Sequence, residues 1–576
     1  MWITFKLFRK VKAADSRACV IHGTEWELSV ELDKENGPFY PQVSEAEGSD
    51  RFRFFAGRVV GHHSSDVPSV PPFANALEPD GGFIALEFDK TSDTLKIASD
   101  LFNAQRWFYF QNEDEWVISN SLRSLHRAVT PKPVLDDGAV PYLLRMGYIP
   151  EPFTPLKNVF SLATGQQLEF SHGKELLKTR AALPLHRRAN LSTDNLGGHV
   201  ADSISNEVKR QIEGLDSIWI PLSGGIDSRF LLACALEAVA PEQIHTLTFG
   251  SAHSLDARIG SRLAKLCGVK NTLLLPDERP LREIIDQNFA VAEGLYWTVP
   301  DYPVKPFSDL LPSNTIALSG FVGDPVFGSK EGKLSIHESA AGREDELVKV
   351  FWKSGTYVDE ASVDALLELR EHDPLHVKEI FRAIPGQTMM ERFDHWYFGQ
   401  HSVNRTMFAV TPARAKAFYV MPFIAGPVLD TAFAIPTEQR MKQQAYFAAL
   451  KAKFPNFYNF PTTRNHGFPL HVRRSPSLLL TRAQRGLMRK LDEQIGDRFG
   501  IHLFHSPRAN YAHPRELLRK KHRDDVIAAI ERLSVLSVMN PLQLKQVKES
   551  VARGVGVDPL LLRGLLTLSQ NVKEYR

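Results

Sequence analysis

The stretch Ile218-Trp219-Ile220-Pro221-Leu222-Ser223-Gly224-Gly225-Ile226-Asp227-Ser228 decides the fold of this chain. Its first residues are apolar and predict a short buried strand, and Ser-Gly-Gly marks a turn in which backbone N–H groups can converge on an anion. From Asp227 onward, Leu231, Leu232 and Leu236 share one face of a predicted helix. A strand, a glycine turn and a helix N-terminus together predict a phosphate-binding site. Asp227 fits such a site when Mg²⁺ lies between its carboxylate and the phosphates.

Two other phosphate-binding motifs do not match this stretch. It contains neither Gly-x-x-x-x-Gly-Lys-Ser/Thr nor Gly-x-Gly-x-x-Gly, which excludes a Walker-type loop and a dinucleotide-binding fingerprint. The sequence Ser-Gly-Gly-Ile-Asp-Ser instead resembles the PP-loop of ATP pyrophosphatases, enzymes that split ATP into AMP and pyrophosphate while they adenylate a substrate. The alternative is an ordinary tight turn between a strand and a helix.

Strands and helices are predicted to alternate after this turn. The predicted strands are 243–250, 271–275 and 315–320, and helices are predicted around 256–267 and 281–292. This alternation predicts a parallel sheet with right-handed crossovers, in which ligands bind outside the carboxyl ends of the strands. The residues expected to bind the nucleotide there are Leu222, Ser223, Gly224, Gly225, Asp227, Ser228, Thr248, Phe249, Gly250 and Gly323.

The composition is that of a soluble globular protein with more than one domain. The chain has 576 residues, 43% of them hydrophobic and 24% charged, with a net charge of +2. This charge gives no global attraction to nucleic acid or membrane. Three cysteines without paired spacing predict a reducing compartment, and the N-terminus lacks the pattern of a signal peptide. We expect a cytoplasmic protein that binds neither nucleic acid nor membrane.

The N-terminal part is rich in predicted strands and carries a second resemblance. The segments that resemble the glutaminase-type domain of class B asparagine synthetases are GGFIALEFD (81–89), DLFN (100–103), WFYF (107–110), ISNS (118–121), RMGYIPEPFT (145–154) and VFSLATG (159–165). A helix is predicted at 136–144, and 180–188 is predicted to link two domains. The resemblance implies a glutaminase-like domain at 1–185 and an asparagine-synthetase-like ATP-binding domain at 194–576.

One position departs from a working glutaminase. Members of that family use a cysteine exposed at the chain start, whereas this sequence has Trp2 there, and an indole cannot attack an amide. The resemblance therefore implies a glutaminase-like domain without glutaminase activity, as in β-lactam synthetases and lasso peptide cyclases. The alternative is a chain trimmed to expose Cys19.

A second motif supplies a second carboxylate. The sequence SGFVGDPVFG (319–328) resembles the family motif Ser-Gly-Glu-Gly-x-Asp-Glu-Leu-Phe-Gly, and Asp324 occupies the position of its aspartate. Asp227 and Asp324 would then hold Mg²⁺. The alternative role for Asp324 is to cap or close a turn. Phe321 stands where asparagine synthetases carry glutamate, and it cannot move a proton.

A later loop is expected to supply positive charge. The stretch Thr463-Arg464-Asn465-His466-Gly467-Phe468 is the counterpart of the loop that places a lysine against pyrophosphate in the family. His466 occupies the lysine position and is only partly cationic at pH 7, so Arg464 could supply the permanent charge. The alternative for His466 is a surface loop histidine. The remaining length is predicted to be helical, and its basic run at 514–523 is either a solvated face or a surface for an acidic peptide or carrier protein.

These features predict an α/β protein. Its N-terminal domain is expected to be an Ntn-hydrolase-like layered β-sheet, and its C-terminal domain a PP-loop sheet of the adenine nucleotide α-hydrolase type with a helical extension. The expected reaction uses ATP and Mg²⁺ to adenylate a carboxylate, which an amine then attacks. The leading hypothesis is a ligase resembling lasso peptide cyclases, acting on a precursor peptide with a leader-processing protease as a partner. The alternatives are an ammonia-dependent asparagine synthetase and a catalytically silent scaffold.

Overall fold

The fold is described by a computed structural model with full side chains. The residues that it describes are 2–9, 19–22, 26–33, 41–44, 50–59, 81–102, 106–112, 115–171, 174–179, 183, 185, 191, 194–275, 279–299, 315–329, 339–369, 371–407, 417–499, 518, 521–554 and 556–576. Within these ranges, no helix has both the length and the apolarity that a membrane span requires. The linker predicted at 180–188 and the basic run at 514–523 lie largely outside the described residues.

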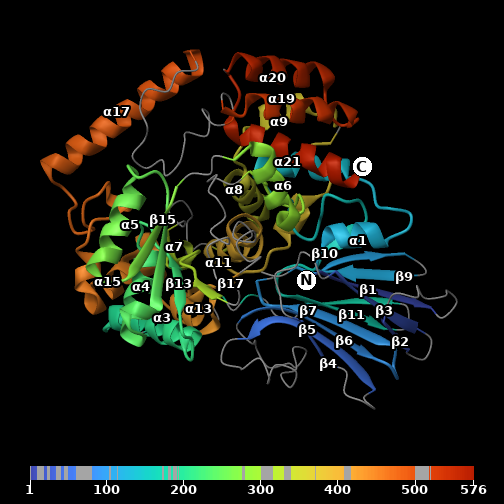
Figure 1. Cartoon of the computed structure of the whole chain (residues 1–576), viewed down its shortest axis with the longest axis horizontal. Coiled ribbons are helices and arrows are strands. Elements are labelled where there is room, and N and C mark those ends of the chain that lie inside the picture. Colours follow the sequence, from blue (N-terminus) through green and yellow to red (C-terminus); the bar gives the residue numbers. More distant parts are fainter. Residues whose placement is uncertain are drawn as a thin grey trace.

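Two antiparallel six-stranded sheets form the N-terminal part, at the lower right of Figure 1. In order across the first sheet, the strands are β10 (Val159–Ser161), β8 (Phe108–Gln111), β9 (Glu115–Ser119), β1 (Trp2–Arg9), β3 (Trp26–Asp33) and β2 (Cys19–His22). In the second they are β12 (Lys174–Thr179), β11 (Gln166–Ser171), β7 (Thr94–Ser99), β6 (Gly81–Asp89), β5 (Arg51–Val59) and β4 (Pro41–Ser44). The layered antiparallel arrangement predicted from the sequence is present.

Aromatic side chains join the two sheets. Phe5 of β1 contacts Phe52 and Phe54 of β5 edge to face, with ring centroids 6.4 Å and 5.4 Å away. Trp116 of β9 contacts Phe170 of β11 in the same way, at 5.0 Å. All five side chains are buried, so the sheets share one core. Because β1 lies between β9 and β3 and supplies this core, cleavage before Cys19 would remove an interior strand.

A five-stranded parallel sheet forms the centre of the C-terminal part. Its order is β15 (Lys270–Leu274), β14 (Ile244–Phe249), β13 (Ile218–Pro221), β16 (Thr315–Leu318) and β17 (Ala417–Val420). All four neighbouring pairs are parallel, as the alternation of strands and helices predicts. The strand order reverses direction at β13, and this is where an open parallel sheet offers a ligand site.

Helices surround this sheet and continue to the C-terminus. Those between and beside the strands are α3 (Leu196–Ile212), α4 (Asp227–Ala238), α5 (Leu255–Leu266), α6 (Leu281–Ala292) and α7 (Gly323–Val326). Between β16 and β17 lie α8 (Glu344–Gly355), α9 (Glu360–Leu366), α10 (Val377–Arg382), α11 (Met389–Trp396) and a π-helix (Tyr397–Met407). After β17 come α13 (Gly426–Phe433), α14 (Thr437–Arg440), α15 (Gln444–Lys453), α16 (Pro455–Tyr458), α17 (Pro476–Phe499), α19 (Arg523–Arg532), α20 (Pro541–Arg553) and α21 (Pro559–Tyr575).

One predicted helix is shorter than expected. The pattern predicts a helix at 136–144, but a 3₁₀ turn occupies Asp137–Ala139 and the α-helix α2 covers Val140–Met146. The Asp136 carboxylate accepts a hydrogen bond from the Gly138 N–H at 2.9 Å, which fixes the turn in place of helix. The helix ends at Gly147, whose φ of 77° suits a residue without a side chain.

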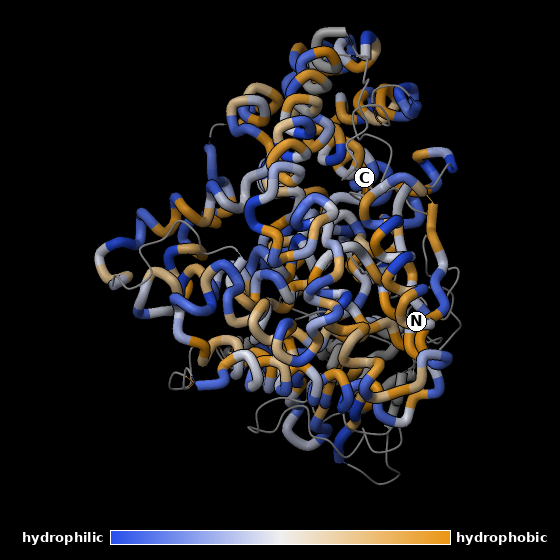
Figure 2. Tube along the Cα trace, turned by 90° about the vertical axis from the view of Figure 1, so that its left-hand side faces the viewer, coloured by the Kyte–Doolittle hydropathy of each residue, from blue (hydrophilic) through white to orange (hydrophobic). Residues whose placement is uncertain are grey.

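A single large core crosses the predicted domain boundary. Its buried apolar side chains run from Phe102 in the N-terminal part to Tyr575 in α21. Figure 2 shows hydrophobic and hydrophilic segments alternating along the uppermost helices, as expected when one face of each helix packs inward. The division at 185–194 stays a prediction, because helices α1 (Leu122–Ala128) and α2 pack into the same core as the parallel sheet.

A buried glutamate joins the two parts. The Glu293 carboxylate, at the end of α6, accepts hydrogen bonds from the Ser121 hydroxyl at 2.6 Å and from the N–H groups of Leu122 and Arg123 at 2.8 Å and 3.1 Å. It thus caps the N-terminus of α1 from the other side of the interface. Burial raises the pKa of Glu293 to about 7, although these hydrogen bonds lower it.

This pKa predicts that stability falls with rising pH. Because the folded state holds the Glu293 proton more tightly than the unfolded state, its contribution is complete below pH 4.5 and is lost as the pH rises to about 7. Relative to Glu293→Gln, the free energy of unfolding of the wild-type chain should fall by about 3 kcal/mol across this window. The thermal midpoints of the two proteins, measured between pH 4.5 and 7.5, should therefore diverge. Glu283→Gln, an exposed position on the same helix, is the matched control. Parallel curves for wild type and Glu293→Gln would contradict the prediction.

Candidate functional site

The glycine turn (residues 222–228) connects β13 to α4 at the carboxyl edge of the sheet. The Ser223 N–H donates to the Ser228 hydroxyl at 3.1 Å, and the Gly225 N–H donates to the Ser223 hydroxyl at 3.0 Å. The Gly224 N–H donates to the carboxylate of Asp256, in α5, at 2.7 Å. The turn therefore gathers N–H groups and hydroxyls at one point, and an anion bound there would compete with Asp256 for Gly224.

Two aspartates meet beside this turn. Asp227 is the first residue of α4, and Asp324 lies in α7 after β16. The Asp324 N–H donates to Asp227 at 3.1 Å, and the Tyr446 hydroxyl donates to the other Asp227 oxygen at 2.9 Å. The Gln443 side-chain amide donates to the Asp324 carboxylate at 2.8 Å. The two aspartates that the sequence predicts as metal ligands are thus brought together from positions 97 residues apart.

The electrostatics of this pair favour a cation. Burial raises the pKa of the Asp227 carboxyl well above its ordinary range, and the negative charge of Asp324 raises it further. Among the described residues, no group of three or more His, Cys, Asp or Glu side chains is placed to hold a metal ion. Mg²⁺ in nucleotide sites uses one or two carboxylates and completes its shell with water and phosphate oxygens. Asp227 and Asp324 fit that donor set, so they are the residues that would hold Mg²⁺.

A loop from the C-terminal part (residues 462–468) closes against the glycine turn. The Thr463 N–H and the Thr462 hydroxyl both donate to the Gly224 carbonyl, at 3.0 Å and 2.9 Å. Arg464 follows, with its guanidinium 3.6 Å from the Asp324 carboxylate and hydrogen-bonded to Gln443. The loop therefore places a permanent positive charge beside the two carboxylates.

His466 lies in the same loop but is placed differently. It has a left-handed backbone, with φ of 58°, and its carbonyl accepts a hydrogen bond from Arg485 of α17 at 3.2 Å. Arg464, in contrast, makes side-chain contacts with the residues around Asp324. The geometry supports Arg464 as the cation of the site, and a direct role for His466 stays a prediction.

The close approach of this loop depends on Gly224. A Cβ atom at this position would lie 2.5 Å from the Thr463 methyl group and 3.0 Å from an Asp256 carboxylate oxygen. Gly224→Ala is therefore expected to push the 462–468 loop away and to lower turnover about 10–100-fold in a pyrophosphate-release assay. The second change Thr463→Ser removes the methyl group and should restore much of the activity. Equal activities of the single and double variants would contradict this account. Gly486→Ala, which meets no atom within 4 Å, is the control.

A buried arginine binds both the glycine turn and the segment that leads to the 462–468 loop. Arg229 is fully buried, and its guanidinium donates to five carbonyl groups. They are those of Gly224 at 3.0 Å, Gly225 at 2.7 Å, Phe457 at 3.0 Å, Phe460 at 3.0 Å and Pro461 at 2.7 Å. Burial lowers the pKa of Arg229 to about 10, which leaves it cationic at neutral pH. The glycine turn and the segment leading to the 462–468 loop therefore share one side chain.

The other predicted binding residues lie at the same edge of the sheet. Leu222 continues the parallel pairing, with its N–H donating to the Leu247 carbonyl at 2.7 Å, and Thr248 to Gly250 end the neighbouring strand β14. The Thr248 hydroxyl donates to the Asn271 side chain at 3.0 Å and is fully buried. At Gly323, a Cβ atom would lie 2.8 Å from the carboxyl carbon of Asp227, so only glycine permits this approach.

Four residues around the site are not among the site residues predicted from the sequence. Tyr446 and Gln443 contact the two aspartates, Asp256 accepts from the glycine turn, and Arg229 joins the turn to the later segment. Arg229 directly follows the motif and could have been flagged as a charged residue on the apolar face of the predicted helix. The others had no sequence signal, because their partners come from distant segments.

Phe321 lies three residues before Asp324, in the turn after β16. Its side chain is 38% exposed, unlike the buried Val322 and Gly323 that follow it. The Phe321 N–H donates to the Ser319 hydroxyl at 3.3 Å, so the residue starts a tight turn after β16. An apolar ring is therefore exposed to solvent close in sequence to Asp324.

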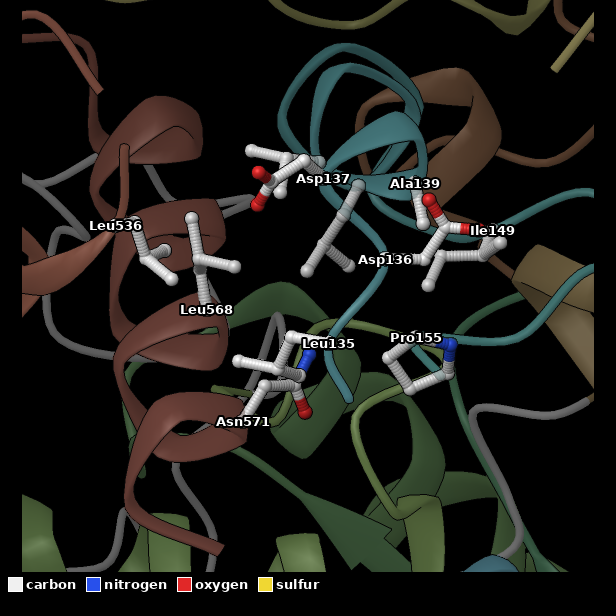
Figure 3. Close-up of a pocket in the computed structure, with 11 residues that line it drawn as sticks. Leu135, Asp136, Asp137, Ala139, Ile149, Pro155, Leu536, Leu568 and Asn571 are labelled. Atoms are coloured by element: carbon white, nitrogen blue, oxygen red, sulfur yellow. The ribbon is translucent and has the colours of Figure 1, made fainter. Parts of the chain in front are cut away.

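A separate pocket lies away from these residues. It encloses about 270 Å³ of empty space, part of it open to solvent, between the start of α2 and helix α21 (Figure 3). Leucine side chains form much of its wall, and its carboxylates are engaged: Asp136 with the Gly138 N–H and Asp137 with the Ser537 hydroxyl at 3.3 Å. None of its lining residues belongs to the candidate site, and we interpret it as a packing gap between two helices.

The fold and the site define an α/β domain whose parallel sheet presents a glycine turn, two carboxylates and an arginine at one edge. Residues 199–454 match the asparagine synthase family. The chain is therefore asparagine synthetase-like over this range, which contains the turn, both aspartates, Gln443 and Tyr446.

A curated relative points in the same direction. "Putative asparagine synthetase (glutamine-hydrolyzing) 2" of Methanocaldococcus jannaschii is 22% identical over 251 residues, which make up 42% of this chain and 48% of the relative. The matched region thus spans about half of the relative's length. Among the solved structures that match is the allosteric regulatory enzyme of purine biosynthesis, with 9% identity, a TM-score of 0.18, and coverage of 55% of this chain and 68% of that chain. Another is the glutamine phosphoribosylpyrophosphate amidotransferase of B. subtilis, with 9% identity, a TM-score of 0.17, and coverage of 55% of this chain and 69% of that chain. At these TM-scores neither supports a conclusion about this chain.

Proposed function

We propose that this protein is an ATP-dependent carbon–nitrogen ligase that adenylates a carboxylate and releases pyrophosphate. One observation carries the proposal. The Asp227 carboxylate accepts a hydrogen bond from the Asp324 backbone N–H at 3.1 Å beside the glycine turn, and the Arg464 guanidinium lies 3.6 Å from the Asp324 carboxylate. Hydroxyls, backbone N–H groups, two carboxylates and a guanidinium are the groups needed to bind a triphosphate and its cation. We assign the domain to the PP-loop, adenine nucleotide α-hydrolase type on this basis.

Each group has a proposed task. The N–H groups of the glycine turn and the N-terminus of α4 hold the phosphates, and Ser223 and Ser228 orient them through their hydroxyls. Bound Mg²⁺ would supply charge neutralisation for the departing pyrophosphate. Arg464 stabilises the negative charge that develops as the bond to the α-phosphorus breaks, and Gln443 holds its guanidinium in position. An amine then attacks the activated acyl group, giving an amide and AMP.

We further propose that the substrate is a peptide, which the enzyme closes into a macrolactam in the manner of lasso peptide cyclases. The exposed ring of Phe321 supports an apolar substrate better than free aspartate, because it stands where a carboxylate would otherwise face the substrate amine. In this proposal the amine is the substrate's own, the N-terminal part is an Ntn-hydrolase-like domain without glutaminase chemistry, and a leader-processing protease is a partner.

A second candidate is an asparagine synthetase that uses ammonia. The match of residues 199–454 to the asparagine synthase family and the name of the curated relative support it. Aspartate and a peptide carboxylate would be activated by the same groups, so the two candidates differ in the acyl and amine substrates and share the adenylation step.

The test is to measure AMP and pyrophosphate released from ATP with Mg²⁺. One reaction contains aspartate and ammonium, and the other contains a candidate precursor peptide followed by mass spectrometry. AMP formation with loss of one water from the peptide is the expected result. AMP formation with aspartate and ammonium alone would establish the second candidate. No AMP with either substrate pair, from protein that binds ATP, would favour a nucleotide-binding scaffold.

A further inference from the structure

Helix α17 makes polar contacts with the body of the protein through two of its arginines. Two of its arginines point toward the body of the protein: Arg482 donates to the Asn465 side chain at 3.0 Å, and Arg485 donates to the His466 carbonyl at 3.2 Å. Leu478 is buried on the same side. Figure 1 shows α17 along the upper left edge of the molecule, apart from the other helices. The helix is thus attached through its cations to the loop that carries Arg464.

The opposite side of α17 carries exposed leucines. Leu480, Leu487 and Leu491 are 70%, 61% and 39% exposed. Their spacing of seven and then four residues places them on one stripe, about 120–180° around the helix from Arg482 and Arg485. A leucine stripe of this period is the pattern with which one helix packs against another.

The surrounding segment is strongly basic. No aspartate or glutamate occurs between residues 439 and 491. The same stretch contains eleven lysines and arginines: Arg440, Lys442, Lys451, Lys453, Arg464, Arg473, Arg474, Arg482, Arg485, Arg489 and Lys490. Asp492, Glu493 and Asp497 follow later in α17, so the stretch 473–498 carries seven lysines and arginines against three acidic residues. This local excess of positive charge stands beside a net charge of only +2 for the whole chain. Arg473, Arg474 and Lys490 are exposed near the leucine stripe.

We propose that the leucine stripe of α17 is the docking surface for an acidic, amphipathic helical segment of the peptide substrate. This inference rests on the proposed peptide-ligase function. Apolar side chains of the partner would cover Leu480, Leu487 and Leu491, and its flanking carboxylates would face the exposed cations. Docking there holds the substrate beside the 462–468 loop, to which Arg482 and Arg485 attach the helix.

The other occupants fit less well. A nucleic acid would match the positive charge but would leave three leucines uncovered. A second copy of the chain would bring a basic helix against a basic helix, and a stripe of three leucines is small for a stable dimer interface. The chain's own residues 500–517 contain Arg508, Arg515 and one acidic residue, Glu516, so their sequence offers no acidic complement. A reversible contact with an acidic peptide suits a substrate that must leave after the reaction.

The test measures binding without ATP. The probe is a fluorescein-labelled 21-residue peptide with leucine at the a and d positions and glutamate at e and g, titrated with the full chain in an anisotropy assay. We expect a dissociation constant on the order of 10 μM. The triple variant Leu480→Gln, Leu487→Gln, Leu491→Gln should bind at least about tenfold more weakly, because glutamine keeps helix propensity but removes the apolar contact. The matched controls Leu266→Gln and Leu542→Gln, at leucines 68% and 63% exposed elsewhere, should bind as the wild type does.

Several results would overturn the docking surface. The first is that the triple variant binds the peptide as tightly as the wild type does. The second is that the wild type binds a peptide with lysine in place of glutamate equally well. The third is that the chain binds a 20-nucleotide single strand and the leucine changes do not weaken this binding. A wild-type dimer in sedimentation that the triple variant abolishes would assign the stripe to a second copy. Because this assay contains no ATP, it separates the two hypotheses: peptide binding without AMP formation contradicts only the ligase, and AMP formation without peptide binding contradicts only the docking surface.

Discussion

Replacing Asp227 by asparagine is expected to reduce pyrophosphate release from ATP by a factor on the order of 10²–10³ while the fold is retained. Asparagine has nearly the same shape, and its one oxygen can still accept from the Asp324 N–H, as Asp227 does at 3.1 Å. Its amide nitrogen can donate to the Tyr446 hydroxyl, which donates to Asp227 at 2.9 Å in the wild type. It lacks the negative charge that a cation at this position requires. The measurement is AMP and pyrophosphate formation at saturating substrate, together with thermal denaturation of the same samples.

Two controls make this experiment specific. Asp202→Asn changes an aspartate on α3 that is 67% exposed and pairs with Lys453, and it should leave turnover unchanged. The melting curve of Asp227→Asn should gain less from ATP with Mg²⁺ than that of the wild type, since ligand stabilisation depends on affinity for the folded state. Unchanged pyrophosphate release in Asp227→Asn would show that the glycine turn is not the ATP site.

Replacing Arg229 by methionine is expected to destabilise the C-terminal part by about 3–5 kcal/mol. Methionine fills a similar volume but donates to none of the five carbonyl groups that Arg229 binds. The thermal midpoint should fall by at least about 6 °C. Turnover should fall too, because the glycine turn and the segment before the 462–468 loop lose the side chain that they share. Arg229→Lys should be intermediate, since lysine keeps the charge with fewer donors.

Arg262→Met is the matched control for this prediction. Arg262 lies over the Phe460 ring at 5.7 Å, close to the 5.9 Å of Arg229, but its side chain is exposed on α5. Its replacement should change the midpoint by no more than about 1–2 °C. Equal losses in the two variants would mean that the ring contact, and not the hydrogen bonds to carbonyls, gives Arg229 its importance.

The sequence predicts the parts of the site that depend on local chemistry. Ser-Gly-Gly-Ile-Asp-Ser needs only its own small residues to form a turn, and the alternation of short apolar runs with helical segments predicts the parallel sheet around it. Strand β17 was missed, because Ala417–Val420 is only four residues long and follows another strand by about a hundred residues.

The contacts between segments could not be predicted in the same way. Tyr446 reaches Asp227 from 219 residues away, and Gln443 has a left-handed backbone, with φ of 62°, that no local residue preference indicates. Their positions follow from how α15 packs, which is a property of the tertiary fold. The helix predicted at 136–144 begins later, at Val140, for a local reason, the hydrogen bond from the Gly138 N–H to the Asp136 side chain.

The C-terminal helix has a consequence for the order in which this protein can assemble during synthesis. Helix α21 packs against α2, where Gly564 allows it to approach Leu144 closely, and its Tyr575 hydroxyl donates to the Glu293 carbonyl at 3.0 Å. The cap that Glu293 places on α1 is therefore covered by a residue synthesised 282 positions later. The sheets of the N-terminal part can form early, but their junction with the rest of the chain must wait for the final turns of α21. The emergence of α21, and not the completion of either N-terminal sheet, should set the moment at which this junction closes.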